Sequence, residues 1–222
     1  MTPECIVIPP GTFLRGGGVD DKFCNATELP RQEMVIRKPF RMSLCPVTLR
    51  QWQAWPGADR GQPPSSLPVT RVSWHQAVAY CAWLSEVSGE GWRLPTETEW
   101  EYACRAGTGT PFSTGDMIAV SQANFLYAED GSRVGVAGLL LVGSFEPNAF
   151  GLHDLHGNVC EWTSDIWRDS YARDAAVDDD RRVIRGGAWD YLPRMLRSSW
   201  RDGLGVFTRR DNLGFRVVSD DT

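Results

Sequence analysis

The stretch RVIRGGAWDYLPRMLRSSWRDGLGVFTRRDNLGFRVV, residues 182–218, decides how the rest of the chain is interpreted. Its two ends have the pattern of β-strands, because Val183 and Ile184 precede a Gly-Gly pair and residues 214–218 alternate small, apolar and charged groups. The middle has no helical period, although it carries Tyr, Trp, Phe and several arginines. We expect a displayed surface held by a strand at each end, or else an ordinary irregular loop that closes a sheet.

The composition of the whole chain argues against several classes of protein. The 222 residues are enough to bury one core, and no stretch has the composition of a linker. The net charge is −5, with 28 acidic against 23 basic residues, which argues against a nucleic-acid partner because phosphate binding needs an excess of cations. No secretory signal or long apolar run is evident, so we predict no membrane insertion and, by default, a cytoplasmic location.

Sulfur and histidine chemistry is sparse. The six cysteines, at positions 5, 24, 45, 81, 104 and 160, form no C-x-x-C spacing, and structural thiols are favoured over disulfides. The three histidines do not form the convergent set that a transition metal needs. The nucleophile elbow, the P-loop and the dinucleotide fingerprint are all absent from the sequence.

Three polar residues mark the starts of helices. Thr48 and Ser73 precede apolar residues at helical spacing, and Gly89 ends the longer helix that Ser73 begins. Thr96 is followed three positions later by Glu99, which predicts a capping box and a second main helix. Elsewhere, residues 4–14 predict an opening strand and hairpin, residues 33–42 a second strand pair, and residues 107–157 no helix longer than two turns.

The stretch around residues 154–161 is rich in oxygen donors. Asp154, Asn158 and Glu161 are separated by backbone that glycine makes flexible, and such oxygen-rich sets suit Ca²⁺. On the residues alone, a hydrogen-bonded turn is the more probable interpretation.

Four motifs, taken in order, carry a family resemblance. They are WRLPTE with EWEYA at residues 92–103, NAFGL with GNVCEW at residues 148–162, RGGAW at residues 185–189, and NLGFR at residues 212–216. Together they resemble the formylglycine-generating-enzyme or sulfatase-modifying-factor domain. The resemblance implies an α+β variant of the C-type lectin fold, with short strands, two main helices and much irregular loop. It also implies a single domain over residues 1–222 with a variable-looking ligand-binding segment at residues 185–216.

The resemblance does not extend to the catalytic residues of the oxidase members. The oxidase members of the family use cysteines between the RGG and GFR motifs to bind copper and activate oxygen. The last cysteine of this chain is Cys160, so that segment has none. Sulfoxide synthases add an iron-binding helical domain, for which 222 residues leave no room. We therefore expect no catalytic residues, no copper or iron, and no enzyme activity.

The resemblance does imply a calcium site. The calcium-binding turn of the family matches residues 154–161, so the predicted ligands are the Asp154 and Glu161 carboxylates and the Gly157 and Val159 carbonyls. An ion held there would have a structural role.

The function implied is ligand binding. One branch of the family contains variable proteins, which diversity-generating retroelements alter by adenine-directed mutagenesis in this C-terminal segment. Lys, Glu and Gln, which NNY codons cannot encode, are absent from residues 182–218. The alternative is a degenerate sulfatase-modifying-factor paralogue or accessory domain that binds a partner enzyme or peptide, and a metal-dependent oxidase is the less favoured third.

The partner in either case is an unidentified protein or other macromolecule. Aromatic and arginine side chains supply most of the energy at protein interfaces. The predicted ligand-binding residues are Asp190, Tyr191, Leu192, Trp200, Asp202, Leu204, Phe207, Arg209 and Arg210. The opposing interpretation is that the aromatic members pack into the core.

Overall fold

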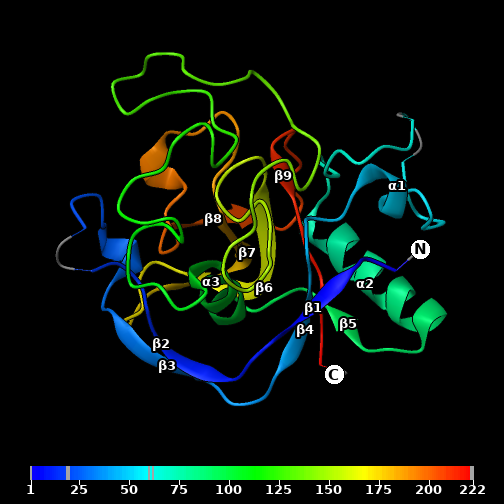
Figure 1. Ribbon diagram of the computed structural model, residues 1–222. Helices are drawn as coiled ribbons and strands as arrows, with labels where there is room; N and C mark the ends of the chain where they lie inside the picture. The colour runs from blue at the N-terminus through cyan, green and yellow to red at the C-terminus, as the bar shows by residue number, and fades with distance from the viewer. Residues whose placement is uncertain (1, 19–20, 60, 62, 221–222) are drawn as a thin grey trace.

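The computed structural model describes residues 2–18, 21–59, 61 and 63–220. It is an α+β structure in which short sheets and helices are joined by long irregular connections (Figure 1). This agrees with the fold class predicted from the motifs. Within the described part of the chain, no helix has the length and hydropathy that a membrane crossing requires.

The first sheet joins the two ends of the chain. Its strand order is β1-β4-β10-β5, and its strands are β1 (Cys5–Ile8), β4 (Phe40–Ser43), β10 (Val218–Ser219) and β5 (Trp92–Arg93). β10 pairs antiparallel with β4 on one side and with β5 on the other. Residues near position 218 therefore complete a sheet that residues near position 5 begin.

A separate two-stranded ribbon curves under the molecule in Figure 1. It consists of β2 (Gly11–Arg15) and β3 (Gln32–Ile36), with Gly11 opposite Ile36. The predicted opening hairpin is wrong in its pairing, because β1 pairs with β4 and β2 pairs with β3. Alternation within residues 4–14 locates both strands, but it contains no information about which distant strand each one meets.

The third sheet carries the C-terminal segment. Its order is β8-β7-β6-β9, and its strands are β8 (Arg201–Gly205), β7 (Val177–Arg185), β6 (Cys160–Arg168) and β9 (Leu213–Gly214). β7 contains the strand expected at the start of the quoted stretch. The strand expected over residues 214–218 is wrong in its middle, because residues 215–217 are not strand and only Gly214, in β9, and Val218, in β10, belong to strands. β8 was not expected: Asp202, Gly203 and Gly205 disfavour a strand, and only the pairing with β7 makes one.

The helices begin where the polar caps predict. They are α1 (Leu49–Trp52), α2 (Trp74–Ser88) and α3 (Glu97–Arg105), together with the short 3₁₀ turns η1 (Ala26–Glu28) and η2 (Pro193–Met195). Thr48, Ser73 and Thr96 each form a complete capping box. Gly89 ends α2 with a φ of 75°, a left-handed conformation that costs glycine little.

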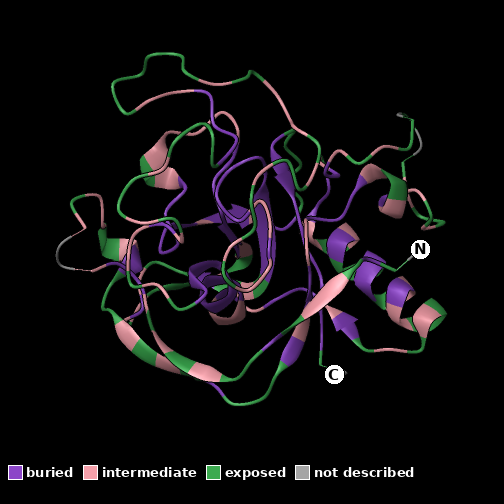
Figure 2. Cartoon of the chain, viewed as in Figure 1, coloured by how far each residue is buried: buried purple, intermediate pink, exposed green. Residues whose placement is uncertain are grey.

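The core lies between α2 and the third sheet, with a second cluster between α3 and the first sheet. In the larger cluster, Trp52 stacks on Tyr80 at 5.6 Å, and Phe215 meets Tyr80 edge-on at 5.4 Å. Figure 2 shows this buried centre, while the long connection over residues 107–157 is largely exposed above it. All six cysteines are free thiols, as the spacing predicted.

Candidate functional site

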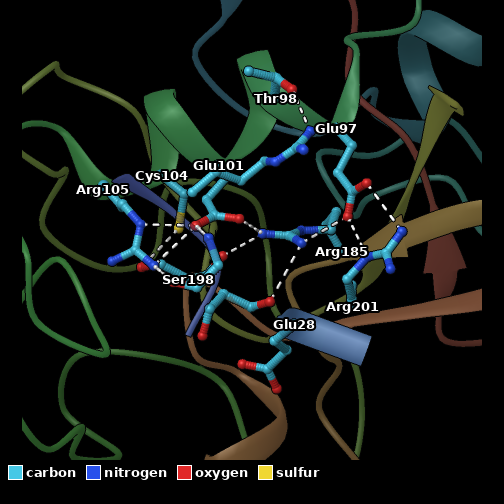
Figure 3. A network of polar contacts seen from close by, with 12 residues as sticks. Glu28, Glu97, Thr98, Glu101, Cys104, Arg105, Arg185, Ser198 and Arg201 are labelled. Carbon is cyan, nitrogen blue, oxygen red and sulfur yellow. Dashed lines mark hydrogen bonds and ion pairs between the residues drawn. The ribbon is translucent and has the colours of Figure 1, made fainter. Parts of the chain in front are cut away.

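A buried polar network fixes the base of the C-terminal segment (Figure 3). Arg185, at the end of β7, is fully buried and donates to Glu97 at 3.0 Å and to Glu101 at 2.7 Å. Arg201 on β8 donates to Glu97 at 2.7 Å, and Arg105 donates to Glu101 at 2.9 Å. Burial by itself raises the pKa of Glu97, but Arg201 and Arg185 outweigh it and hold that pKa below its usual value. Glu97 is therefore a structural anion.

A second buried arginine ties the segment to the N-terminal part of the chain. Arg197 donates to Glu28 at 2.6 and 2.8 Å and to Asp21 at 2.5 Å. It also donates to the carbonyls of Phe23 and Arg194 and to the Ser199 hydroxyl. The segment between β7 and β8 is thus anchored by arginine side chains, and among its residues 186–200 only Arg194 is exposed.

Four of the predicted ligand-binding residues meet at one place. Asp190, Tyr191, Arg209 and Arg210 line a shallow hollow of about 740 Å³. The hollow, called here the polar hollow, is completed by Asp59, Arg71, Asp211 and Asn212. Three guanidinium groups and three carboxylates therefore share one open surface at the end of the third sheet.

The polar hollow has a hydrogen-bonded floor and exposed charged side chains at its rim. Asn212 is buried and donates to Asp190 at 2.8 Å, which fixes that carboxylate. Tyr191 meets Trp200 edge-on at 5.7 Å. Burial raises the pKa of both the Tyr191 hydroxyl and the Cys160 thiol. Neither group is an activated nucleophile at neutral pH.

The remaining predicted residues do not join the polar hollow. Trp200 and Leu204 are 6% and 8% exposed and belong to the main core, so the expectation that they are displayed is corrected. Leu204 lies in β8 and Trp200 directly precedes this strand. The sequence pattern did not reveal which side of β8 faces the core. Asp202 is half-buried and lies 3.5 Å from Arg181. Leu192 is half-buried at the start of η2, and Phe207 is 79% exposed beside the His75 ring.

Asp59, Arg71, Asp211 and Asn212 are members of the polar hollow that sequence reasoning missed. Asp211 and Asn212 lie within the quoted stretch, so their neighbours Arg209 and Arg210 were a usable signal. Arg71 adopts a φ of 58°, which is uncommon for a residue other than glycine, and its amide donates to the Arg210 carbonyl. Nothing in the local sequence predicts that conformation.

The residues predicted to bind calcium lie where the chain enters β6. Glu161 is fully buried and accepts bonds from Arg216 at 2.7 and 2.8 Å and from Trp100 at 2.7 Å. Asp154 accepts a bond from the Gly143 amide through Oδ2, while its Oδ1 is buried without a partner among the described residues. In the described ranges, no group of three or more His, Cys, Asp and Glu side chains is placed to hold a metal.

The Asp154 oxygen is the feature that fits a cation, because buried polar atoms in native proteins nearly always have a partner. Glu161 fits in part: its Oε1 accepts one bond from Arg216, and a carboxylate oxygen has two lone pairs. With the carbonyls of Gly157 and Val159, these atoms would form an oxygen-only set of the kind Ca²⁺ takes. A bound ion would supply positive charge to the turn that leads into β6. Calcium binding stays a prediction.

Removal of calcium is expected to lower the melting temperature. At a calcium concentration one hundred times the Kd, binding stabilises the folded state by about 2.7 kcal/mol, which corresponds to roughly 5 to 10 °C for a chain of this length. The measurement is thermal unfolding in calcium and in EGTA. Asp154→Ala should abolish the difference, whereas Asp130→Ala, on an exposed loop, should preserve it. Equal melting temperatures and no metal by mass spectrometry in the wild type would count against the site.

Comparison with known proteins places this chain in a family. The sulfatase-modifying factor enzyme 1-like domain matches residues 1–221. The chain belongs to this family. The inactive Cα-formylglycine-generating enzyme 2 of Mus musculus is 37% identical over 98% of this chain and 86% of that protein. Other relatives of this sulfatase-modifying factor enzyme 1-like domain are named as formylglycine-generating enzymes, and the match covers 45% of the one from Mus musculus.

Solved structures show the same family fold. PvdO from Pseudomonas aeruginosa superposes with a TM-score of 0.84 at 32% identity, covering 98% of this chain and 94% of that one. The Treponema denticola variable protein 1 superposes with a TM-score of 0.73 at 23% identity, covering 97% and 94%, a likeness that concerns the fold alone. The chain thus has the C-type lectin-like fold that its resemblance to the family implied.

Proposed function

We propose that the protein is a non-enzymatic ligand-binding member of its family, and that the polar hollow is the surface that binds a macromolecular partner. The observation that carries the proposal is that the C-terminal segment lacks the cysteine nucleophile of the oxidase members but brings polar side chains together on an open surface. No cysteine follows Cys160, whose thiol is buried and has a raised pKa. Asp190, Tyr191, Arg209 and Arg210 nevertheless converge on one open surface.

The composition of the polar hollow suits a folded polar surface better than a small apolar molecule. Its exposed arginines can each form planar, paired hydrogen bonds with a carboxylate, and Tyr191 offers an aromatic face with a polar tip. Arg209 lies only 3.6 Å from Asp59, and both are exposed, so this weak ion pair can be exchanged for contacts with a partner. Side chains of both signs favour a partner that also carries both signs.

The finer proposal is that this protein is the target of a diversity-generating retroelement. It is supported by the likeness in fold to a variable protein and by the absence of Lys, Glu and Gln from residues 182–218. The exposed rim residues can change without disturbing the buried arginines beneath them. A near-copy of the codons for residues 185–216, with adenines at the varied positions and a reverse-transcriptase gene nearby, is the expected finding.

A second candidate function is that of a degenerate paralogue which binds a partner enzyme or peptide without variation. The 37% identity with an inactive formylglycine-generating enzyme favours it. The absence of any template repeat near the gene would select this candidate over the first. Aldehyde formation on a Cys-x-Pro-x-Arg peptide supplied with copper and reductant would contradict both and restore an oxidase.

The binding proposal predicts that substitutions in the polar hollow abolish partner binding and leave the stability of the protein unchanged. The triple variant Arg209→Ser, Arg210→Ser, Asp211→Ser alters only exposed members of the polar hollow, so the free energy of unfolding should change by about 1 kcal/mol or less. A control variant, Arg37→Ser, Arg173→Ser, Asp174→Ser, changes the same residue types on other exposed surfaces. The measurement is quantitative capture of proteins from a lysate of the source organism.

The wild type and the control variant should retain the same captured protein, and the triple variant should lose at least nine-tenths of it. If the triple variant captures that protein as well as the wild type does, the polar hollow is not the binding surface. If the triple variant unfolds, the arginines of the rim are part of the scaffold, and the separation proposed here fails.

A further inference from the structure

A second cavity lies away from the polar hollow. It has a volume of about 760 Å³ and shares none of its described lining residues with the polar hollow. Its walls come from three parts of the chain, namely residues 18 and 21–31, residues 105–134, and residues 193–199, which include η2. The volume falls within the range of pockets that hold small molecules in proteins. We call it the side pocket.

The floor of the side pocket is apolar. Phe112 and Phe125, which are 4% and 3% exposed, form a small hydrophobic cluster with Ala123 and Leu196, and Ile118 packs against it. Phe112, Ile118 and Phe125 also line the side pocket. These three side chains therefore bring apolar atoms to the wall of the side pocket.

Three of the four described arginines that line the side pocket, Arg105, Arg194 and Arg197, have carboxylate partners. Arg197 is bonded to Asp21 at 2.5 Å, and Arg105 is bonded to Glu101 at 2.9 Å. At the mouth, Arg194 lies 3.5 Å from Glu129, and its amide donates to the same carboxylate at 2.6 Å. An ion brought into the side pocket would compete with these internal pairs, and the cost of removing its own hydration shell would add to that competition. An uncharged ligand avoids both costs.

The rim favours a flat ring. The Arg194 guanidinium lies 6.0 Å from the centre of the Phe23 ring, and the Lys22 ammonium lies 4.7 Å from it. Phe23 lines the side pocket together with the apolar residues of its floor. Aromatic faces and guanidinium planes both bind planar π-systems, which gain from offset stacking and from the nearby cations. We infer that the side pocket is a second binding site, for an uncharged planar aromatic small molecule.

The proposal is tested with 2-naphthol as the probe. Binding is measured from the chemical-shift changes of the ¹⁵N-labelled protein during titration. Wild-type protein should bind the probe saturably with a Kd of about 1 mM or tighter, the range that a fragment of this size reaches in a matching pocket. 2-Naphthoate, which has the same rings and a negative charge, should bind at least tenfold more weakly. Equal or tighter binding of the naphthoate would overturn the assignment to uncharged ligands.

Two variants locate the binding. Ala128 lines the side pocket and is half-buried, so Ala128→Trp should fill the cavity and weaken naphthol binding at least tenfold. Val134→Trp, at a more exposed lining position, should do the same and covers the case in which the first variant does not fold. Ala79→Trp, on the exposed face of α2, is the matched control and should bind as the wild type does.

The proposal is overturned if the wild type shows no saturable shift, or if a folded variant with a filled cavity binds naphthol as well as the control does. The test is independent of the proposed function. The triple variant of the polar hollow should bind naphthol normally, so loss of partner capture and loss of naphthol binding report on two different sites.

Discussion

Replacing Arg185 with methionine is expected to lower the free energy of unfolding by about 3 to 5 kcal/mol. Arg185 has no exposed surface, and its guanidinium bonds Glu97, Glu101 and the Ser198 carbonyl. Methionine fills much of the same volume but donates no hydrogen bond. Two buried carboxylates and one carbonyl would each lose a donor, and an unpaired buried polar group is costly. Urea unfolding at pH 7 measures the loss.

The matched control is Arg93→Met. Arg93 also pairs with two carboxylates, Glu99 at 2.7 Å and Asp220 at 2.5 Å, but its side chain is 35% exposed. Solvent screens such pairs, so the loss should be about 1 kcal/mol or less. Similar losses in the two variants would show that burial of the network does not set its contribution. A loss below about 1 kcal/mol for Arg185→Met would contradict the structural role assigned to it.

Acidification from pH 7 to pH 4 is expected to remove about 3 kcal/mol of stability through His156 alone. Burial lowers the pKa of His156 from 6.5 to about 4, although the carbonyl of Leu196 acts in the opposite direction. The unfolded chain takes up a proton near pH 6.5, whereas the folded protein takes it up only near pH 4. Between these values the unfolded state binds more protons, so stability falls as the pH falls.

The surroundings of His156 explain why it stays neutral. One ring nitrogen lies 2.7 Å from the Leu196 carbonyl, and the other accepts the Ser113 amide at 3.1 Å. The Cys104 thiol and the Phe112 ring cover the remaining sides. The measurement compares the unfolding free energy of the wild type and of His156→Gln across this pH range. The variant should lack the His156 part of the decline, and parallel curves would contradict the assignment.

The parts of the fold that local chemistry dictates were predictable. Thr48, Ser73 and Thr96 began helices because a side-chain oxygen and a residue three positions later satisfy the first amides of a helix wherever that helix packs. The pairing of β1 with β4 and the strand β8 were not predictable. Both depend on partners distant in sequence, and the Gly203 and Gly205 pattern of β8 opposes a strand until β7 supplies the hydrogen bonds.

The candidate site was also predictable only in part. The four motifs identified the family, which the match over residues 1–221 confirms. The exposure of Phe207, Arg209 and Arg210 agreed with their placement in an irregular stretch. Trp200 was misplaced because a tryptophan in such a stretch gives no sign of which way it points until the strand that follows it is known. Arg71 lines the polar hollow with its backbone in a left-handed conformation, and the sequence does not indicate that conformation.

The position of β10 between β4 and β5 has a consequence for synthesis on the ribosome. Val218 pairs with Met42 on one side and with Arg93 on the other, so the first sheet has a gap at its centre until residue 219 has left the exit tunnel. An emerging chain therefore exposes the inner edges of β4 and β5 for most of the time needed for translation. Unpaired strand edges are where newly made chains associate wrongly. Slow synthesis of the residues between β5 and β10, or arrest before residue 218, would prolong that exposure and increase the chance of wrong association.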